Sequence, residues 1–139
     1  METKLENSAT FEKLRRAFFE EAGLAYRYLF FATVADFEGL DRHAAIFREL
    51  AEGGTMSVQG CLDFLRTARD PSSDIPIGGT RKNLESLLQT ELEQSSESYP
   101  AWALLAREEG FTDIASWFDT LEKLKRIHVK TLSGLQNEK

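Results

Sequence analysis

Residues 70–79 read DPSSDIPIGG, and this stretch divides the sequence into two helical halves. It is the one long connection in the chain, and its richness in Pro, Ser and Gly is typical of a loop. On both sides of it, apolar residues recur at three- and four-residue spacing, which indicates amphipathic helices. No segment alternates with the period of a strand over a useful length. The loop therefore predicts two pairs of helices joined by one crossover.

Each half contains two long helical segments separated by a glycine. We expect helices over residues 11–37, 42–69, 81–109 and 113–135. Thr10 is the expected cap of the first helix, Gly39 and Gly110 end the first and third, and Pro100 should kink or split the third. The pattern predicts an all-α, ferritin-like four-helix bundle with a long crossover between helices two and three, forming a single domain over residues 1–139.

Composition excludes several classes of function. The chain has 139 residues, of which 42% are hydrophobic, and a net charge of −6, which argues against nucleic acid or an anionic membrane as partner. No run of about 18 apolar residues is present, and METKLENSATFEKL lacks the layout of a signal peptide, so we expect a cytoplasmic protein. The single cysteine, Cys61, cannot form an internal disulfide, and no CxxC motif is available for zinc or iron.

Polar or very small residues interrupt the apolar stripe of every helix near its middle. These residues are Glu21, Gly54, Ser57, Glu91, Gln94, Lys125 and His128. In an antiparallel bundle the helix midpoints meet at one level, so Glu21 and Glu91 would face Lys125 and His128. A buried carboxylate is costly unless it is paired, and such a cluster would come close to local neutrality without a metal. The alternative is that some of these side chains lie on a helix flank and reach solvent.

These residues resemble a known family. The chain is similar to the ferritin-like domain of the rubrerythrins across nearly its whole length. The stretches that carry the resemblance are YRYLFFATVADFEG, AAIFRELAEG, CLDFLRTARDP, PIGGTRKNL and ESYPAWALLAREEGFTDIASWFDTLEK, followed by His128. The resemblance implies a non-haem di-iron peroxidase that reduces hydrogen peroxide at a carboxylate-bridged iron pair. It also implies a rubredoxin-like domain with four cysteines, which we expect to be lacking here.

The resemblance also implies which positions would hold the metal. The family's ligands fall on Glu21, Glu91 and His128, which are kept, and on four changed positions. The helix-two motif Glu-x-x-His reads GTMS at residues 54–57, the second helix-three glutamate is Gln94, and the helix-four motif reads KRIH at residues 125–128. Bridging carboxylates screen the repulsion between two cations, and both are absent here. The ammonium of Lys125 would itself repel a metal, so we expect no working di-iron centre.

Three functions remain open from the sequence. The first is a metal-free binding or scaffold protein, not an enzyme, whose core charge cluster replaces the metal. The second is a peroxide-related oxidoreductase with a single iron, manganese or zinc ion on the three kept ligands. The third is a small-ligand binder that uses the space vacated at Gly54 and Ser57. We also expect a homodimer, with Trp102 near the Pro100 kink as a candidate contact with a copy or with another protein partner.

Overall fold

The computed structural model describes residues 4–138, and all of the regular structure in this range is helical. This confirms the all-α, ferritin-like fold class. The elements, in chain order, are the 3₁₀-helix η1 (Leu5–Asn7), α1 (Ala9–Phe37), α2 (Asp41–Leu65), α3 (Thr80–Glu93), the π-helix η2 (Gln94–Ser98), α4 (Tyr99–Glu108) and α5 (Thr112–Leu135). No helix of the described range is long and apolar enough to cross a membrane.

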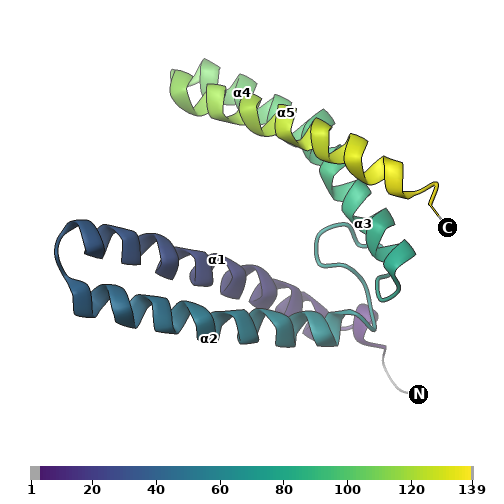
Figure 1. Ribbon diagram of the computed structural model, residues 1–139. Coiled ribbons are helices and arrows are strands. Elements are labelled where there is room, and N and C mark those ends of the chain that lie inside the picture. Colours follow the sequence, from purple (N-terminus) through teal and green to yellow (C-terminus); the bar gives the residue numbers. More distant parts are fainter. Residues whose placement is uncertain (1–3, 139) are drawn as a thin grey trace. The chain divides into compact units, whose positions relative to one another are not determined.

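The chain divides into two compact units within the loop quoted above, between Pro71 and Ser72. In the first unit, α1 and α2 run antiparallel and side by side, and we call it the N-terminal hairpin (Figure 1). In the second unit, α3, η2 and α4 form one arm and α5 returns along it, and we call it the C-terminal hairpin. Each hairpin has its own contacts between helices.

Each hairpin turns at a glycine with positive φ. Gly39 has φ +74° and Gly110 has φ +87°. Residues that carry a Cβ rarely adopt this backbone conformation. The backbone N–H of the residue after each glycine donates a hydrogen bond to a carbonyl in the last turn of the preceding helix. Leu40 donates to the carbonyl of Ala35 at 2.9 Å, and Phe111 donates to that of Ala106 at 2.8 Å. The sequence-based prediction that these two glycines end helices is confirmed.

The two hairpins are copies of one pattern, offset by 71 residues. Identical residues at this spacing include Tyr28 and Tyr99, Ala32 and Ala103, Ala35 and Ala106, Gly39 and Gly110, Ala44 and Ala115, and Phe47 and Phe118. The tyrosine and phenylalanine rings contact each other in both hairpins, with centroids 6.4 Å and 6.1 Å apart. Such a repeat indicates that one helical pair serves as the structural unit.

An ion pair recurs in the two copies with its charges exchanged. Arg48 bonds Asp36 near the tip of the N-terminal hairpin, and Arg107 bonds Asp119 in the C-terminal hairpin. The hydrogen bond and the charge of the aspartate raise the pKa of each arginine above its ordinary value. Both pairs join the two arms of their own hairpin next to the turn, so they hold the register of the helices.

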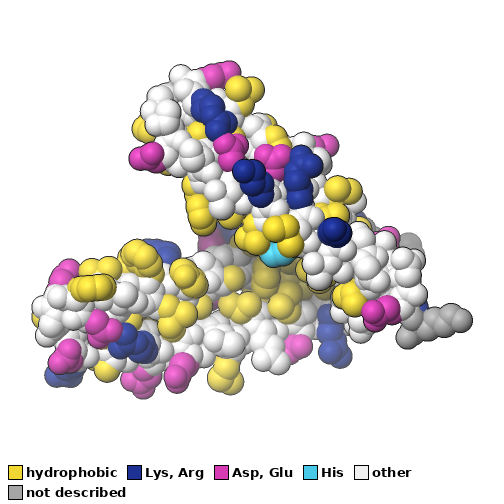
Figure 2. Space-filling model, turned by 45° about the horizontal axis from the view of Figure 1, so that its top comes forward, with side chains coloured by type: hydrophobic (Ala, Val, Ile, Leu, Met, Phe, Trp, Pro, Cys, Tyr) yellow, Lys and Arg dark blue, Asp and Glu magenta, His cyan; other side chains and the backbone are white. Residues whose placement is uncertain are grey.

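Alanine makes up most of the buried core. Ala32, Ala44 and Ala51 are buried between α1 and α2, and Ala103 and Ala115 are buried between α4 and α5. Small side chains at these contacts let the helices approach closely, whereas many large apolar side chains remain exposed. Hydrophobic side chains accordingly show at the surface of both hairpins in Figure 2. At the end of the N-terminal hairpin away from its turn, Phe11, Leu65 and Ala68 form a separate buried cluster.

Two helix ends differ from the predicted ones. Ser8, not Thr10, caps α1, because its Oγ accepts the N–H of Phe11 at 3.2 Å. The helix α2 ends at Leu65 and not at residue 69, because the backbone tightens: Ala68 N–H donates to the carbonyl of Leu65, three residues back. Thr67 Oγ1 also bonds the Phe64 carbonyl at 3.0 Å, which satisfies an acceptor at the helix end.

Pro100 divides the predicted third helix, as its sequence position indicated. A proline lacks the N–H that an α-helix needs, and its ring clashes with the carbonyl four residues earlier. The structure widens to a π-helix over Gln94–Ser98 before this residue, and α4 begins at Tyr99. Segments of π-helix are frequently found at functional sites, and this one begins at a predicted site residue.

Candidate functional site

A carboxylate in the C-terminal hairpin is held by two basic side chains. Glu91 projects from α3, and Lys125 and His128 project from α5 one turn apart, so both reach the same carboxylate. Lys125 Nζ lies 3.2 Å from Glu91 Oε1, and His128 Nδ1 lies 3.2 Å from Glu91 Oε2. Each oxygen of Glu91 therefore has its own nitrogen partner. The sequence predicted that these three residues would meet, and the structure brings them together.

The cluster is partly shielded from water. The side chains of Glu91 and Lys125 are 16% and 19% exposed, whereas that of His128 is 43% exposed. The Lys125–Glu91 contact is thus less exposed to water than a surface ion pair, and the His128–Glu91 contact is more open. We call Glu91, Lys125 and His128 the basic clamp.

Gln94 lies one turn beyond Glu91, where the π-helix begins. Its Oε1 atom is buried and has no hydrogen-bond partner among residues 4–138. Buried acceptors normally accept a hydrogen bond, so an unpaired buried oxygen is unusual. It lies on the residue one turn from Glu91 of the basic clamp. The resemblance places Gln94 at a ligand position of the family, and its buried Oε1 accepts no hydrogen bond from the described residues.

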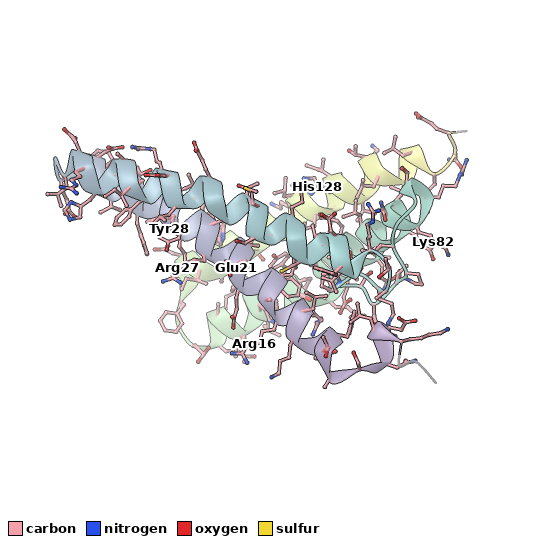
Figure 3. All side chains as sticks on the ribbon, turned by 90° about the horizontal axis from the view of Figure 1, so that it is seen from below. Arg16, Glu21, Arg27, Tyr28, Lys82 and His128 are labelled. Carbon is pink, nitrogen blue, oxygen red and sulfur yellow. The ribbon has the colours of Figure 1, made fainter. Side chains whose placement is uncertain are left out.

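The remaining predicted site residues lie in the N-terminal hairpin. Glu21 on α1 and Gly54 and Ser57 on α2 line one open groove, together with Leu24, Ala25, Tyr28, Glu49, Leu50 and Gly53. Figure 3 marks Glu21 and Tyr28, two turns apart on α1. Glu21 is partly buried and makes no ion pair within the described part of its hairpin. The expectation that it faces Lys125 concerns a residue of the other hairpin and stays a prediction.

Gly54 is at a close approach of the two helices. A Cβ placed on Gly54 would lie 3.1 Å from the Cβ of Ala25, which is closer than most real contacts of a Cβ atom. The neighbouring Gly53 has nothing within 4 Å of such an atom. The sequence suggested that Gly54 and Ser57 leave space that a small ligand could use. On the side toward α1 this space is taken by Ala25, and the groove lined by Glu21, Gly54 and Ser57 stays open, so the small-ligand hypothesis stays a prediction.

The repeat relates predicted site residues of the two hairpins. Gly54 and Lys125 are equivalent at the 71-residue offset, and so are Ser57 and His128. The same position of the repeat therefore has no side chain in one hairpin and carries an ammonium in the other. Sequence reasoning compared each position with a family motif and missed this internal equivalence, although the identical tyrosine, alanine and glycine spacings were visible.

Neither hairpin offers a ready metal site within residues 4–138. No three His, Cys, Asp or Glu side chains of one described hairpin are grouped so that they could hold a metal ion. Cys61 is partly buried in α2 and is a free thiol. Trp102, named above as a candidate contact, is about half exposed on α4.

The known proteins that are similar in sequence to this chain are rubrerythrins. A rubrerythrin of Porphyromonas gingivalis is 35% identical over 141 residues, covering 97% of this chain and 70% of the relative. Rubrerythrin-1 of Clostridium acetobutylicum is 30% identical, with 94% and 71% covered. A rubrerythrin of Nitratidesulfovibrio vulgaris is 29% identical, with 91% and 68% covered. No family model matches the chain.

Proposed function

Because this chain belongs to the rubrerythrin family, we propose that it is a metal-free member in which a charge cluster replaces the metal. In this proposal it is a binding or scaffold protein of the cytoplasm, not an enzyme. The observation that carries the proposal is the basic clamp, in which Lys125 and His128 occupy both oxygens of Glu91. An ammonium provides there the positive charge that a metal would otherwise supply.

The residues present do not fit an iron pair. A divalent ion bound to Glu91 would lie about 4 Å from the Lys125 ammonium, and their repulsion would be about 8 kcal/mol at an effective dielectric constant of about 20. The ion would have to displace Lys125, and the neighbouring Gln94 offers only a neutral amide. At Gly54 no ligand atom is available, and the close contact with Ala25 resists a larger side chain.

A scaffold role agrees with the surface of the two hairpins. Large apolar side chains such as Met56, Phe64 and Leu104 are more than half exposed. Exposed apolar side chains that gather into large patches often mark surfaces that bind another protein. We therefore also propose that the protein works as a homodimer, in which part of this surface is covered by a second copy.

Metal analysis tests the proposal. The protein is produced in medium supplemented with iron, manganese and zinc, and its metal content is measured by elemental analysis after purification. We expect less than about 0.1 metal ion per chain. The matched comparison restores the family's ligands in the C-terminal hairpin only, with Gln94→Glu and Lys125→Glu, and so avoids the close contact of Gly54 with Ala25. We expect this variant to gain metal, which shows that the fold and the assay can support binding.

A thermal-shift measurement adds a second readout. Because the metal is added to the purified protein, the result does not depend on a bound ion surviving purification. A ligand present at 100 times its dissociation constant stabilises a protein by about 2.7 kcal/mol, which raises Tm by several degrees. We expect iron, manganese or zinc to leave the Tm of the unchanged chain within about 1 °C. Stoichiometric metal, or a clear rise in Tm, would reject the metal-free proposal and support a single-ion oxidoreductase instead.

A further inference from the structure

The side chain of Met56 stands clear of its neighbours on α2. It is 77% exposed, more than any other large apolar side chain of the described residues except Phe37. Positions 53 and 60, one turn before and one turn after it on the same side of the helix, are glycines. A Cβ built on Gly53 or on Gly60 would find no atom within 4 Å. The thioether of Met56 is therefore open to solvent in both directions along the helix.

The sulfur of Met56 is the more accessible of the two sulfur atoms in residues 4–138. The other belongs to Cys61, five residues further along α2, which is a partly buried free thiol. A thiol reacts with oxidants as the thiolate and must first lose a proton, whereas a thioether has no proton to lose. Oxidation of sulfur in the described range is therefore expected first at Met56.

Met56 also lies in the stretch of α2 that has the weakest tendency to be helical. Residues 53–60 read GGTMSVQG, and glycine is, after proline, the least favourable residue in a helix interior. Thr55 and Val58 are β-branched, which lowers helix propensity further. Met56 and Gln59 are the strong helix formers of the stretch, and none of its residues is buried. A loss of helix propensity at Met56 therefore has little packing to offset it.

The chemical step is a two-electron oxidation by a hydroperoxide. A lone pair of the Met56 Sδ atom attacks one oxygen of hydrogen peroxide, so that an S–O bond forms while the O–O bond breaks. The sulfur is oxidised to the sulfoxide, the proton of the attacked oxygen passes to the departing hydroxide, and the peroxide is reduced to water. Methionine sulfoxide reductases reverse the change, with the oxygen leaving as water and the thiols of the reductase becoming a disulfide.

The sulfoxide changes the helix from the side opposite its packing contact. Oxidation replaces a flexible apolar side chain with a polar one, whose oxygen competes for hydrogen-bond donors as other short polar groups do. Gly54, two residues earlier, faces Ala25 of α1, and two residues turn a helix by about 200°. The change at Met56 therefore acts on the segment that holds the contact between α1 and α2 without entering that contact.

We propose that Met56 is a site of reversible oxidation by hydroperoxides, and that its sulfoxide loosens residues 53–60 of α2. This goes beyond the binding function proposed above and does not depend on it. Peptide mass spectrometry of the full chain, treated with hydrogen peroxide in the presence of a chelator, gives the site and the rate. We expect one added oxygen at Met56, at a rate within about 3-fold of that in the urea-unfolded chain, because susceptibility follows exposure.

A pair of variants tests whether the neighbouring glycine keeps the thioether open. Gly53→Leu places a side chain one turn from Met56 and should slow its oxidation about 2-fold or more, since susceptibility follows exposure. Ala45→Leu, at another exposed position of α2, is the control and should leave the rate unchanged. A rate in the unchanged chain more than about 10-fold below that of the unfolded chain would show that the thioether is covered, and would overturn the proposal.

Hydrogen exchange tests the effect on the helix. We expect backbone amides of residues 53–60 to exchange about 3- to 10-fold faster after oxidation, while those of α4 and α5 keep their rates and serve as an internal control. Sulfoxide reductases should restore slow exchange, and a simple thiol should not. Met56→Leu should remove both the added oxygen and the faster exchange. Unchanged exchange in the oxidised chain, or faster exchange of peroxide-treated Met56→Leu, would overturn the loosening by Met56.

Discussion

The most informative perturbation removes the ammonium from the basic clamp. Lys125→Met keeps the length of the side chain and its apolar stem but takes away the charge that pairs with Glu91. The carboxylate then keeps only His128 as a partner, while its side chain remains 16% exposed. An uncompensated, mostly buried charge is destabilising, so we expect a lower free energy of unfolding.

The magnitude follows from the geometry of the pair. At 3.2 Å and an effective dielectric constant of about 20, the attraction is about 5 kcal/mol before desolvation is subtracted. Breaking a fully buried pair costs about 3–5 kcal/mol, and an exposed pair contributes about 0.2–1 kcal/mol. Because both side chains are about four-fifths buried, we expect Lys125→Met to cost about 2–3 kcal/mol.

Urea unfolding followed by circular dichroism measures this cost, and a double-mutant cycle isolates the pair. Glu91→Gln in the Lys125→Met background removes the stranded charge, so the double variant should be less destabilised than the sum of the two single ones. Lys82→Met is the control, because its pair with Glu85 has a similar distance of 3.4 Å but side chains 59% and 54% exposed. If Lys125→Met costs less than about 0.5 kcal/mol, like this control, the clamp is not a structural replacement for a metal.

Three further predictions concern the backbone. Gly53→Ala should stabilise the protein by up to about 1 kcal/mol, because alanine has the higher helix propensity. Gly54→Ala should stabilise it less or destabilise it, because the new Cβ would lie 3.1 Å from Ala25. The urea midpoints of the two variants compare them directly. Gly110→Ala should cost about 1–2 kcal/mol because its φ is +87°, and a Tm that is unchanged would contradict this. Ser8→Ala should cost about 1 kcal/mol by removing the cap of α1, measurable by calorimetry, and Ser8→Thr should retain most of the stability.

The helix ends that could be predicted from the sequence are those at which a single residue type determines the backbone conformation. A glycine that follows an amphipathic run must take a positive φ to end the helix, so Gly39 and Gly110 could be placed from sequence alone. The end of α2 could not, because the polar run to Arg69 continues the helical pattern while the backbone tightens after Leu65. That tightening is set by local hydrogen bonds, which leave little trace in residue type.

The candidate site was predictable in composition and only partly in geometry. The meeting of Glu91, Lys125 and His128 followed from helical spacing, since positions one turn apart share a face. The contact between Gly54 and Ala25 did not, because it depends on how closely α1 approaches α2. That distance is determined by the buried alanines along the whole interface, and a single position does not reveal it.

The repeat shows how equivalent positions of the two hairpins have been accommodated differently. Gly54 and Lys125 occupy equivalent positions, yet the first is accommodated by a contact with Ala25 and the second by a salt bridge to Glu91. Both solutions lie within one hairpin, so neither requires a group shared between the two. Each change is thus accommodated by contacts within its own repeat, and the helical framework of both hairpins is kept.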